Sequence, residues 1–138
     1  MEWKKSNPIY PVADVGASIE WYGRVFGFEP RIVNPPGEVL VYAVLYRDGV
    51  SIHLLRKDEA PHGLTSPVEA QFWIDGELDD LFESVLRMGV EVIRAPGDRP
   101  WGHRDFMVAD LDRNIVWVTV PVPKGAVSHE NAADDHPS

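Results

Sequence analysis

Hydrophobic and polar positions repeat with two different periods along the first 56 residues, and each change of period marks the boundary of a predicted element. Hydrophobic side chains that alternate with polar ones predict half-buried strands. These strands are predicted at residues 8–14, 28–33, 39–46 and 50–55. Between the first two strands, a helical repeat predicts a helix with Ser18 as its N-cap and Gly27 at its end. The predicted order of the first half is therefore β-α-β-β-β.

The second half repeats this order after a polar stretch at 56–67, whose prolines and glycine predict a linker. A stripe of Leu, Phe and Val at helical spacing predicts a helix at 78–88. The strands of this half are predicted at residues 69–75, 90–94, 104–109 and 115–120. A loop rich in Pro, Gly and Trp is predicted at 95–102. Residues 123–138 have no apolar period, so a disordered tail is predicted there.

The two halves align with one another at a nearly constant offset, which indicates an internal duplication. Pairs at an offset of 62 include Val12 with Ile74 and Gly27 with Gly89, and pairs at 64 include Leu54 with Val118. At this second offset Tyr42 and Phe106 are expected to occupy matching positions. The sequence thus predicts an α+β fold in which two tandem βαβββ modules form a curved mixed sheet around a cleft. The modules are predicted at about 7–56 and 68–121 of a domain that spans 1–122.

Strand alternation also predicts which side chains face the cleft, because successive residues of a strand point to opposite faces of the sheet. In the strand at 69–75, Glu69 and Trp73 lie on a mixed polar and aromatic face, and the opposite face is apolar and suited to the helix. By the same alternation, His53 and Trp117 lie on the mixed faces of their strands. Two mixed faces that curl toward each other predict a small-molecule cleft.

Composition and charge narrow the functional classes. The 138 residues carry a formal net charge of −9, which argues against nucleic acid as a partner and is compatible with a cationic small molecule. No stretch has the roughly 20 apolar residues that a membrane helix needs. The absence of cysteine excludes disulfides, thiolate metal sites and a cysteine nucleophile. The lysines near the N-terminus precede no apolar core, so no signal peptide is predicted and a cytoplasmic location is expected.

Motifs in both halves resemble one protein family. They lie at residues 11–15, 18–22, 25–28, 72–75, 78–81, 100–106 and 110–114. With these motifs the sequence resembles the vicinal oxygen chelate superfamily of glyoxalases, dioxygenases and bleomycin-resistance proteins. The run Pro-Trp-Gly-His-Arg-Asp-Phe at 100–106 is the most specific motif and is most similar to the bleomycin-resistance branch. A departure is Leu-Asp-Arg at 111–113, where the family usually reads Pro-Asp-Gly. The resemblance covers about residues 7–120 and implies a homodimer.

The resemblance also implies where a metal would bind in a catalytic member. The four positions that hold a divalent metal fall on Asn7, His53, Glu69 and Trp117. His53 and Glu69 are competent ligands, whereas the Asn7 amide oxygen is weak and the Trp117 indole offers no donor atom. Because a catalytic site normally needs three good protein ligands, neither a metal nor another cofactor is expected. The alternative is a degenerate divalent-metal site formed by His53 and Glu69, which would then be the catalytic residues.

The candidate ligand-binding residues combine aromatic and charged side chains. They are Trp101, Gly102, Trp73, His53, Glu69, Trp117, Tyr42, Phe106 and Arg104. Trp101 lies on a predicted loop, where it is expected to stack on a planar ligand. Trp73 and Trp117 either line the cleft or fill it. Arg104 either anchors an anionic group or pairs with Asp105 or Glu69.

His53 and Glu69 each have more than one interpretation. His53 is a residual metal ligand, a hydrogen-bonding group of the cleft, or a histidine satisfied within the sheet. Glu69 is a general base, a carboxylate that binds a cation, or the partner of an arginine, because an unpaired buried carboxylate is costly.

Three functions are consistent with these residues. The favoured one, implied by the bleomycin-resistance resemblance, is metal-independent binding and sequestration of a planar, cationic small molecule. The alternative is a glyoxalase- or dioxygenase-type enzyme (lyase, isomerase or oxidoreductase), with a divalent metal at the degenerate site or with Glu69 as base. The third is a domain with a filled cleft that serves association.

Overall fold

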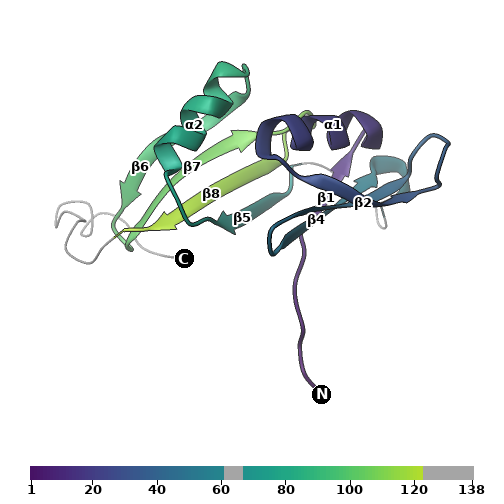
Figure 1. Cartoon of the computed structure of the whole chain (residues 1–138), viewed down its shortest axis with the longest axis horizontal. Helices are drawn as coiled ribbons and strands as arrows, with labels where there is room; N and C mark the ends of the chain where they lie inside the picture. The colour runs from purple at the N-terminus through teal and green to yellow at the C-terminus, as the bar shows by residue number, and fades with distance from the viewer. Residues whose placement is uncertain (61–66, 123–138) are drawn as a thin grey trace. The chain divides into compact units, whose positions relative to one another are not determined.

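The computed structural model describes residues 1–60 and 67–122, and their strands and helices follow the order β-α-β-β-β twice (Figure 1). A short 3-10 helix, η1 (Lys57–Glu59), follows the first set. This arrangement confirms the predicted α+β class with two tandem βαβββ modules. The predicted disordered tail at 123–138 lies outside the described residues, as do residues 61–66 of the predicted linker.

The first module (module 1) forms a four-stranded mixed sheet in the order β1-β4-β3-β2. Its elements are β1 (Ile9–Val12), α1 (Val15–Phe26), β2 (Glu29–Asn34), β3 (Tyr42–Arg47) and β4 (Val50–Arg56). Strand β1 is parallel to β4, and the other neighbouring pairs are antiparallel. On the side of α1, the Tyr10 and Tyr22 rings stack with centroids 5.8 Å apart. The alternate side chains, beginning with Ile9, therefore lie on the opposite side of this sheet.

The N-cap of helix α1 lies four residues before Ser18, the predicted N-cap. Asp14 is the N-cap, because its carboxylate accepts a hydrogen bond of 3.0 Å from the Ala17 backbone N–H. Ser18 lies inside the helix and is buried, so its prediction as N-cap was wrong. The helix ends at Gly27 as predicted, where a φ of 73° requires the left-handed conformation that glycine adopts readily.

The second module (module 2) repeats the sheet in the order β5-β8-β7-β6. Its elements are β5 (Glu69–Trp73), α2 (Leu78–Arg87), β6 (Glu91–Arg99), β7 (His103–Ala109) and β8 (Ile115–Pro121). Strand β5 is parallel to β8, and the other pairs are antiparallel. Strand β6 runs through most of the segment 95–102 that was predicted as a loop, because it pairs with β7 as far as Arg99.

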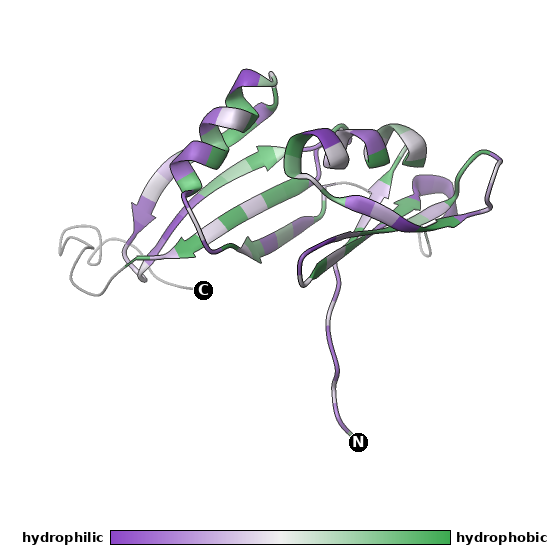
Figure 2. Cartoon of the chain, viewed as in Figure 1, coloured by the Kyte–Doolittle hydropathy of each residue, from purple (hydrophilic) through white to green (hydrophobic). Residues whose placement is uncertain are grey.

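Hydrophobic residues alternate with hydrophilic ones along the strands of both sheets (Figure 2). In module 2 the Phe106 side chain is fully buried and its ring lies 5.3 Å from that of Phe82 in α2. The residues that share the face of Phe106 therefore pack under the helix, and the alternate residues occupy the other face. Burial of the apolar helix-side faces is the main stabilising contribution in each module.

The turn between β7 and β8, Asp110–Asn114, belongs with module 1 rather than with the strands that flank it. The Tyr22 hydroxyl donates to Asp110 Oδ2 at 2.8 Å, and Asn114 Nδ2 donates to the Pro11 carbonyl at 2.9 Å. Burial raises the pKa of Asp110, and the hydrogen bonds from Tyr22 and Asn114 oppose that rise. Among the described residues, the two compact units are thus 1–60 and 67–68 with this turn, and 69–109 with 115–122.

The same turn contains the departure from Pro-Asp-Gly at 111–113. Arg113 has a φ of 64°, the left-handed conformation that glycine usually supplies. The Asp112 carboxylate accepts a hydrogen bond of 3.0 Å from the Ala13 backbone N–H. The turn therefore forms without the glycine.

Candidate ligand-binding face

The sheet of module 2 presents a polar and aromatic face on the side opposite α2, which we call the module 2 face. It comprises Glu69, Gln71 and Trp73 of β5, Trp117 and Thr119 of β8, His103, Asp105 and Met107 of β7, and Glu91, Arg94 and Arg99 of β6. The strand registers set these residues in rows. Gln71, Trp117, Met107 and Arg94 form one row across the four strands. Trp73, Thr119, Asp105 and Gly97 form the next.

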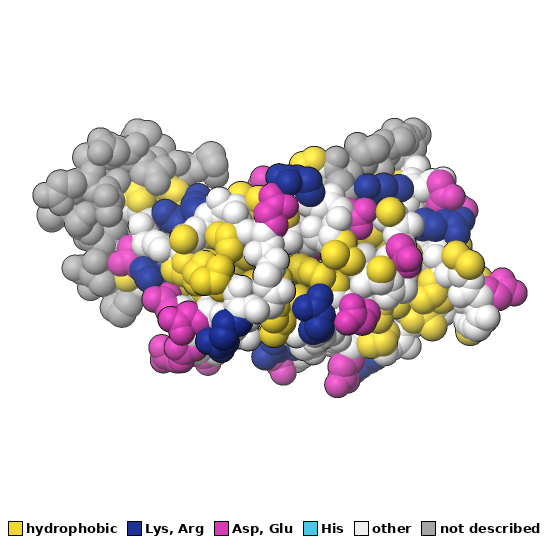
Figure 3. All heavy atoms as spheres, turned by 90° about the horizontal axis from the view of Figure 1, so that it is seen from above, with side chains coloured by type: hydrophobic (Ala, Val, Ile, Leu, Met, Phe, Trp, Pro, Cys, Tyr) yellow, Lys and Arg dark blue, Asp and Glu magenta, His cyan; other side chains and the backbone are white. Residues whose placement is uncertain are grey.

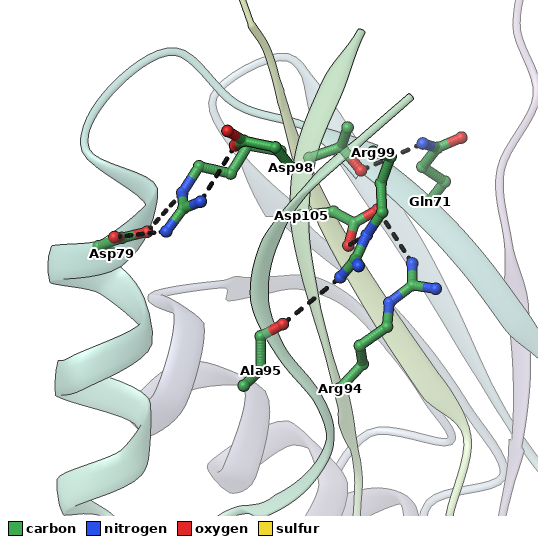
Figure 4. Close-up of polar contacts among 9 residues, drawn as sticks. Gln71, Asp79, Arg94, Ala95, Asp98, Arg99 and Asp105 are labelled. Carbon is green, nitrogen blue, oxygen red and sulfur yellow. Dashed lines mark hydrogen bonds and ion pairs between the residues drawn. The ribbon is translucent and has the colours of Figure 1, made fainter. Parts of the chain in front are cut away.

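The centre of the module 2 face is a buried carboxylate held by two guanidinium groups (Figure 4). Asp105 is fully buried, and its Oδ2 accepts from Arg94 Nη2 at 2.9 Å while its Oδ1 accepts from Arg99 Nε at 3.0 Å. Gly97 lies opposite Asp105, and a Cβ there would lie only 3.1 Å from Arg99 Nη1. The absence of a side chain at Gly97 therefore leaves space for Arg99 to reach the carboxylate.

A β-bulge brings the two arginines to the same face. Arg94 and Arg99 are five residues apart, so a regular strand would direct them to opposite faces. The register shifts between Arg94 and Gly97, where β6 contributes one residue more than β7. Sequence reasoning missed this cluster because it treated 95–102 as a loop. The only signal was the odd spacing of two arginines near an acidic residue of the neighbouring strand.

Three aromatic rings lie next to this cluster. The rings of Trp73 and His103 meet edge-to-face with centroids 4.4 Å apart, and those of Trp101 and His103 do so at 6.4 Å. Trp73 keeps 50% of its surface exposed. Trp101 lies in the turn after β6, beside Gly102, whose φ of 94° requires glycine. The structure thus groups Trp73, Trp101 and Gly102, which were predicted as ligand-binding residues.

Trp117 lies in the middle of the module 2 face. The guanidinium carbon of Arg94 lies 5.7 Å from the centroid of the Trp117 ring, within the range of a cation–π contact. Its parallel neighbour Gln71 donates to Thr119 Oγ1 at 3.1 Å. Trp117 is partly exposed, so it contributes to the face rather than to the core under α2.

Three shielded nitrogen atoms of the module 2 face have no hydrogen-bond partner among the residues that the structure describes. They are Arg94 Nε, His103 Nδ1 and Trp117 Nε1. The arginine and indole nitrogens are obligatory donors, and a buried donor without an acceptor costs about 1–3 kcal/mol. The face therefore holds hydrogen-bonding capacity that its own side chains do not use.

Module 1 presents a different face, the module 1 face, on the side opposite α1. It comprises Ile9 of β1, Glu29, Ile32 and Asn34 of β2, Tyr42, Val44 and Tyr46 of β3, and Ser51, His53 and Leu55 of β4. The guanidinium carbon of Arg31 lies 4.8 Å from the centroid of the Tyr46 ring. The Tyr42 hydroxyl and His53 Nδ1 lie 2.6 Å apart and share a hydrogen bond. Burial and the nearby Lys5 ammonium lower the pKa of His53, so its imidazole is neutral at pH 7. His53 is therefore a hydrogen-bonded residue of the sheet face.

The four positions that correspond to a family metal site do not offer a suitable donor set. Asn7 Oδ1 already accepts a hydrogen bond from the Ser51 hydroxyl, and the Trp117 indole has no lone pair to offer. Within residues 1–60 and 67–122, no group of three His, Cys, Asp or Glu side chains is placed to hold a metal ion. The residues present thus do not fit the divalent metal of catalytic relatives, and no ion pair in these ranges involves Glu69.

Two predicted ligand-binding residues lie on the helix side of module 2. Phe106 is a core residue under α2. Arg104 forms ion pairs, but not with the predicted carboxylates of Asp105 or Glu69. Its guanidinium donates to the Asp79 carboxylate in the first turn of α2 at 2.8 and 3.0 Å, and to Asp98 at 3.0 Å (Figure 4). These contacts raise the pKa of Arg104 and lower that of Asp79. The strand parity of β7 explains both positions, because residues 104 and 106 alternate with His103 and Asp105.

The predicted match of Tyr42 with Phe106 was also wrong. Tyr42 pairs with Leu55, and Asp105 pairs with Thr119 in the corresponding row of module 2. The structural equivalent of Tyr42 is therefore Asp105, at an offset of 63. The one-residue difference places Tyr42 and Phe106 on opposite faces of their sheets.

Surface charge is dispersed on the side of the molecule seen in Figure 3. There, Lys and Arg side chains are interspersed with Asp and Glu rather than gathered into one basic region. The chain, with its net charge of −9, therefore presents no large basic region on this side. None of the described helices has the length and apolar character needed to cross a membrane.

Sequence comparison places the chain in a known group of proteins. The profile of the "Glyoxalase/Bleomycin resistance protein/Dioxygenase superfamily" matches residues 7–118. No curated protein matches the chain in sequence.

Solved structures share the fold at low sequence identity. TioX from Micromonospora sp. ML1 is 22% identical with a TM-score of 0.72, and the alignment covers 86% of this chain and 100% of TioX. A superfamily member from Sphaerobacter thermophilus is 17% identical with a TM-score of 0.75, covering 86% and 98%. Lactoylglutathione lyase from Agrobacterium tumefaciens is 18% identical with a TM-score of 0.71, covering 85% and 92%. These similarities establish the fold alone.

Proposed function

The chain belongs to the Glyoxalase/Bleomycin resistance protein/Dioxygenase superfamily, and we propose that it binds a planar small molecule without a metal ion. The observation that carries the proposal is the edge-to-face cluster of Trp73, His103 and Trp101 on the module 2 face. A planar ligand can stack on indole rings whose orientations are held by contact with a neighbouring imidazole.

The physical basis of the proposal is the exposure and the support of these rings. Trp73 is half exposed although it lies within a strand, so half of its large apolar surface remains available to a ligand. Trp101 lies in a turn, where core packing does not account for its indole. Each stacked aromatic pair is worth about 0.5–1.5 kcal/mol beyond the area it buries.

The proposed activity is sequestration rather than catalysis. The donor set does not fit a divalent metal, and His53, the histidine of the corresponding metal position, bonds to Tyr42 instead. We also propose, from the family resemblance, that two chains pair as a homodimer, which light scattering of the purified protein tests by its mass.

The test uses two planar tricyclic fluorophores of opposite charge, anthracene-2-carboxylate and the aminoacridine cation proflavine, with protein dialysed against EDTA. Fluorescence anisotropy is expected to report binding of at least one. Trp73→Ala is expected to weaken it about 5- to 100-fold, as loss of an aromatic anchor typically does. Added Zn²⁺ is expected to leave the affinity unchanged.

Trp3→Ala is the matched control, because Trp3 is 89% exposed and precedes β1. It is expected to retain wild-type affinity. Failure of both fluorophores to bind, or equal losses in the Trp73 and Trp3 variants, contradicts the proposal.

A further inference from the structure

The two faces of the module 2 sheet pair arginines and carboxylates in opposite ratios. On the helix side one guanidinium, that of Arg104, serves two carboxylates. On the module 2 face two guanidiniums serve one carboxylate, Asp105. The Arg–Asp cluster of the module 2 face therefore carries one positive charge in excess, although the chain as a whole carries −9.

The second guanidinium is not needed to neutralise the Asp105 carboxylate. A single bidentate guanidinium suffices to neutralise a buried carboxylate, and each further buried charge has a desolvation cost. Arg94 and Arg99 keep 35% and 19% of their side-chain surfaces exposed, so both extend beyond the carboxylate that they hold. Arg99 Nη2 also donates to the Ala95 carbonyl at 3.5 Å (Figure 4). Among the described residues, no hydrogen bond involves Arg94 Nη1 or Arg99 Nη1, which leaves these groups for a second acceptor.

The unpartnered donors lie next to this positive charge. Arg94 Nε and Trp117 Nε1 have no acceptor among the described residues, and the Arg94 guanidinium lies over the Trp117 ring. Arg99 pairs across the sheet with His103, whose ring contacts both Trp73 and Trp101. The donors are thus adjacent to the rings on which the ligand is proposed to stack.

Two further residues with carboxylates, Glu69 and Glu91, lie at the other end of the same face. They share the row of Ile115 and Ala109, one row beyond Trp117, whereas His103 and Arg99 lie two rows beyond Trp117 on the opposite side. An anionic group near Arg99 therefore stands away from Glu69 and Glu91.

We infer that the ligand of the module 2 face is a planar aromatic acid, whose anionic oxygens accept hydrogen bonds from Arg94, Arg99 and Trp117. This inference rests on the proposed function and revises the charge expected of the ligand. The cationic ligand was implied by the family resemblance and was compatible with the net charge of the whole chain, but recognition depends on the charges at the site.

The test compares three probes with the same ring system: 2-naphthoate, 2-naphthamide and naphthalen-2-ylmethylammonium. Isothermal titration calorimetry of the full chain is expected to give an affinity for 2-naphthoate about tenfold or more above that for the ammonium, with the amide between them. Arg94→Gln is expected to reduce this preference about tenfold. Trp117→Phe keeps an aromatic ring but removes the N–H, and is expected to weaken 2-naphthoate about threefold.

Arg104→Gln is the matched control, because it removes a guanidinium from the other face of the same sheet. It is expected to leave the preference unchanged. Equal affinities of the three probes, or a preference for the ammonium, overturn the inference while the proposed binding function stands. If none of the three binds the wild-type chain, the proposed function falls and the inference falls with it. If Arg94→Gln does not fold, the affinity of Trp117→Phe for 2-naphthoate tests the inference instead, and an affinity equal to that of the wild type contradicts it.

Discussion

The two modules of this chain share one backbone arrangement and differ in the side chains they present on the faces opposite their helices. In module 1 the central row across the sheet reads Ile9, His53, Val44 and Ile32. The corresponding row of module 2 reads Gln71, Trp117, Met107 and Arg94. In the next row, Tyr42 of module 1 corresponds to the buried Asp105 of module 2.

This difference shows where a duplicated fold tolerates change. The helix-side faces remain apolar in both modules, as with Leu54 and its counterpart Val118, because they form the cores. The opposite faces carry no such constraint, and they have diverged. Module 1 has a Tyr–His pair and an arginine over Tyr46, whereas module 2 has a buried Arg–Asp cluster beside indole rings. A ligand that needs both ring stacking and charge recognition is therefore expected on module 2.

The largest expected difference in stability is between variants of Asp105 and Tyr42, which occupy equivalent positions in the two modules. Asp105→Ala leaves two guanidiniums facing each other without their carboxylate, and is expected to reduce the free energy of unfolding by about 3–5 kcal/mol. Tyr42→Phe removes one hydrogen bond to His53 and is expected to cost about 1 kcal/mol. Urea denaturation followed by circular dichroism measures both. Equal losses would show that the Arg–Asp cluster contributes no more than the Tyr–His pair.

A smaller effect is expected on the helix side of module 2. Arg104→Gln removes the link between Asp79 of α2 and Asp98 of β6, and is expected to cost about 1 kcal/mol or less, because these partners are largely exposed. Urea denaturation at low and at 0.5 M NaCl checks this, since salt should shrink the difference between wild type and variant. A loss that is insensitive to salt would point to lost packing instead.

The smallest expected effect is a pH dependence that belongs to module 1. The pKa of His53 is lowered in the folded chain, so its contribution to stability is complete above its ordinary value of about 6.5 and is lost as the pH falls toward the folded value. Wild type is expected to lose under about 1 kcal/mol more than His53→Gln between pH 7.5 and 5. Thermal unfolding across this range measures the difference. Parallel curves for the two proteins would contradict the assignment.

The fold was predictable from the sequence because period-two and helical repeats recur at a nearly constant offset in both halves. The pattern placed Trp73 and Trp117 on the face opposite the helix, and the turn residues of 100–102 placed Trp101 outside the core. These placements were correct because they depend on which residues are buried, and hydrophobic periodicity predicts burial.

The errors arose where a single residue changes the parity of a strand. The bulge between Arg94 and Gly97 brings Arg94 and Arg99 to one face, and no periodicity signals such an insertion in advance. The one-residue difference in offset between the modules likewise turned Phe106 from an expected ligand contact into a core residue. Ser18 failed as N-cap because Asp14 supplies the same capping bond one turn earlier.

The most direct test of the central claim, that a planar acid binds on the module 2 face, uses the five tryptophans as reporters. In a ¹⁵N-labelled sample titrated with 2-naphthoate, each indole N–H gives one signal. The signals of Trp73, Trp101 and Trp117 are expected to shift together with one dissociation constant, while those of Trp3 and of Trp21, which is buried in α1, stay in place. Shifts confined to Trp3 or Trp21, or an unchanged Trp117 signal at saturation, would contradict the account.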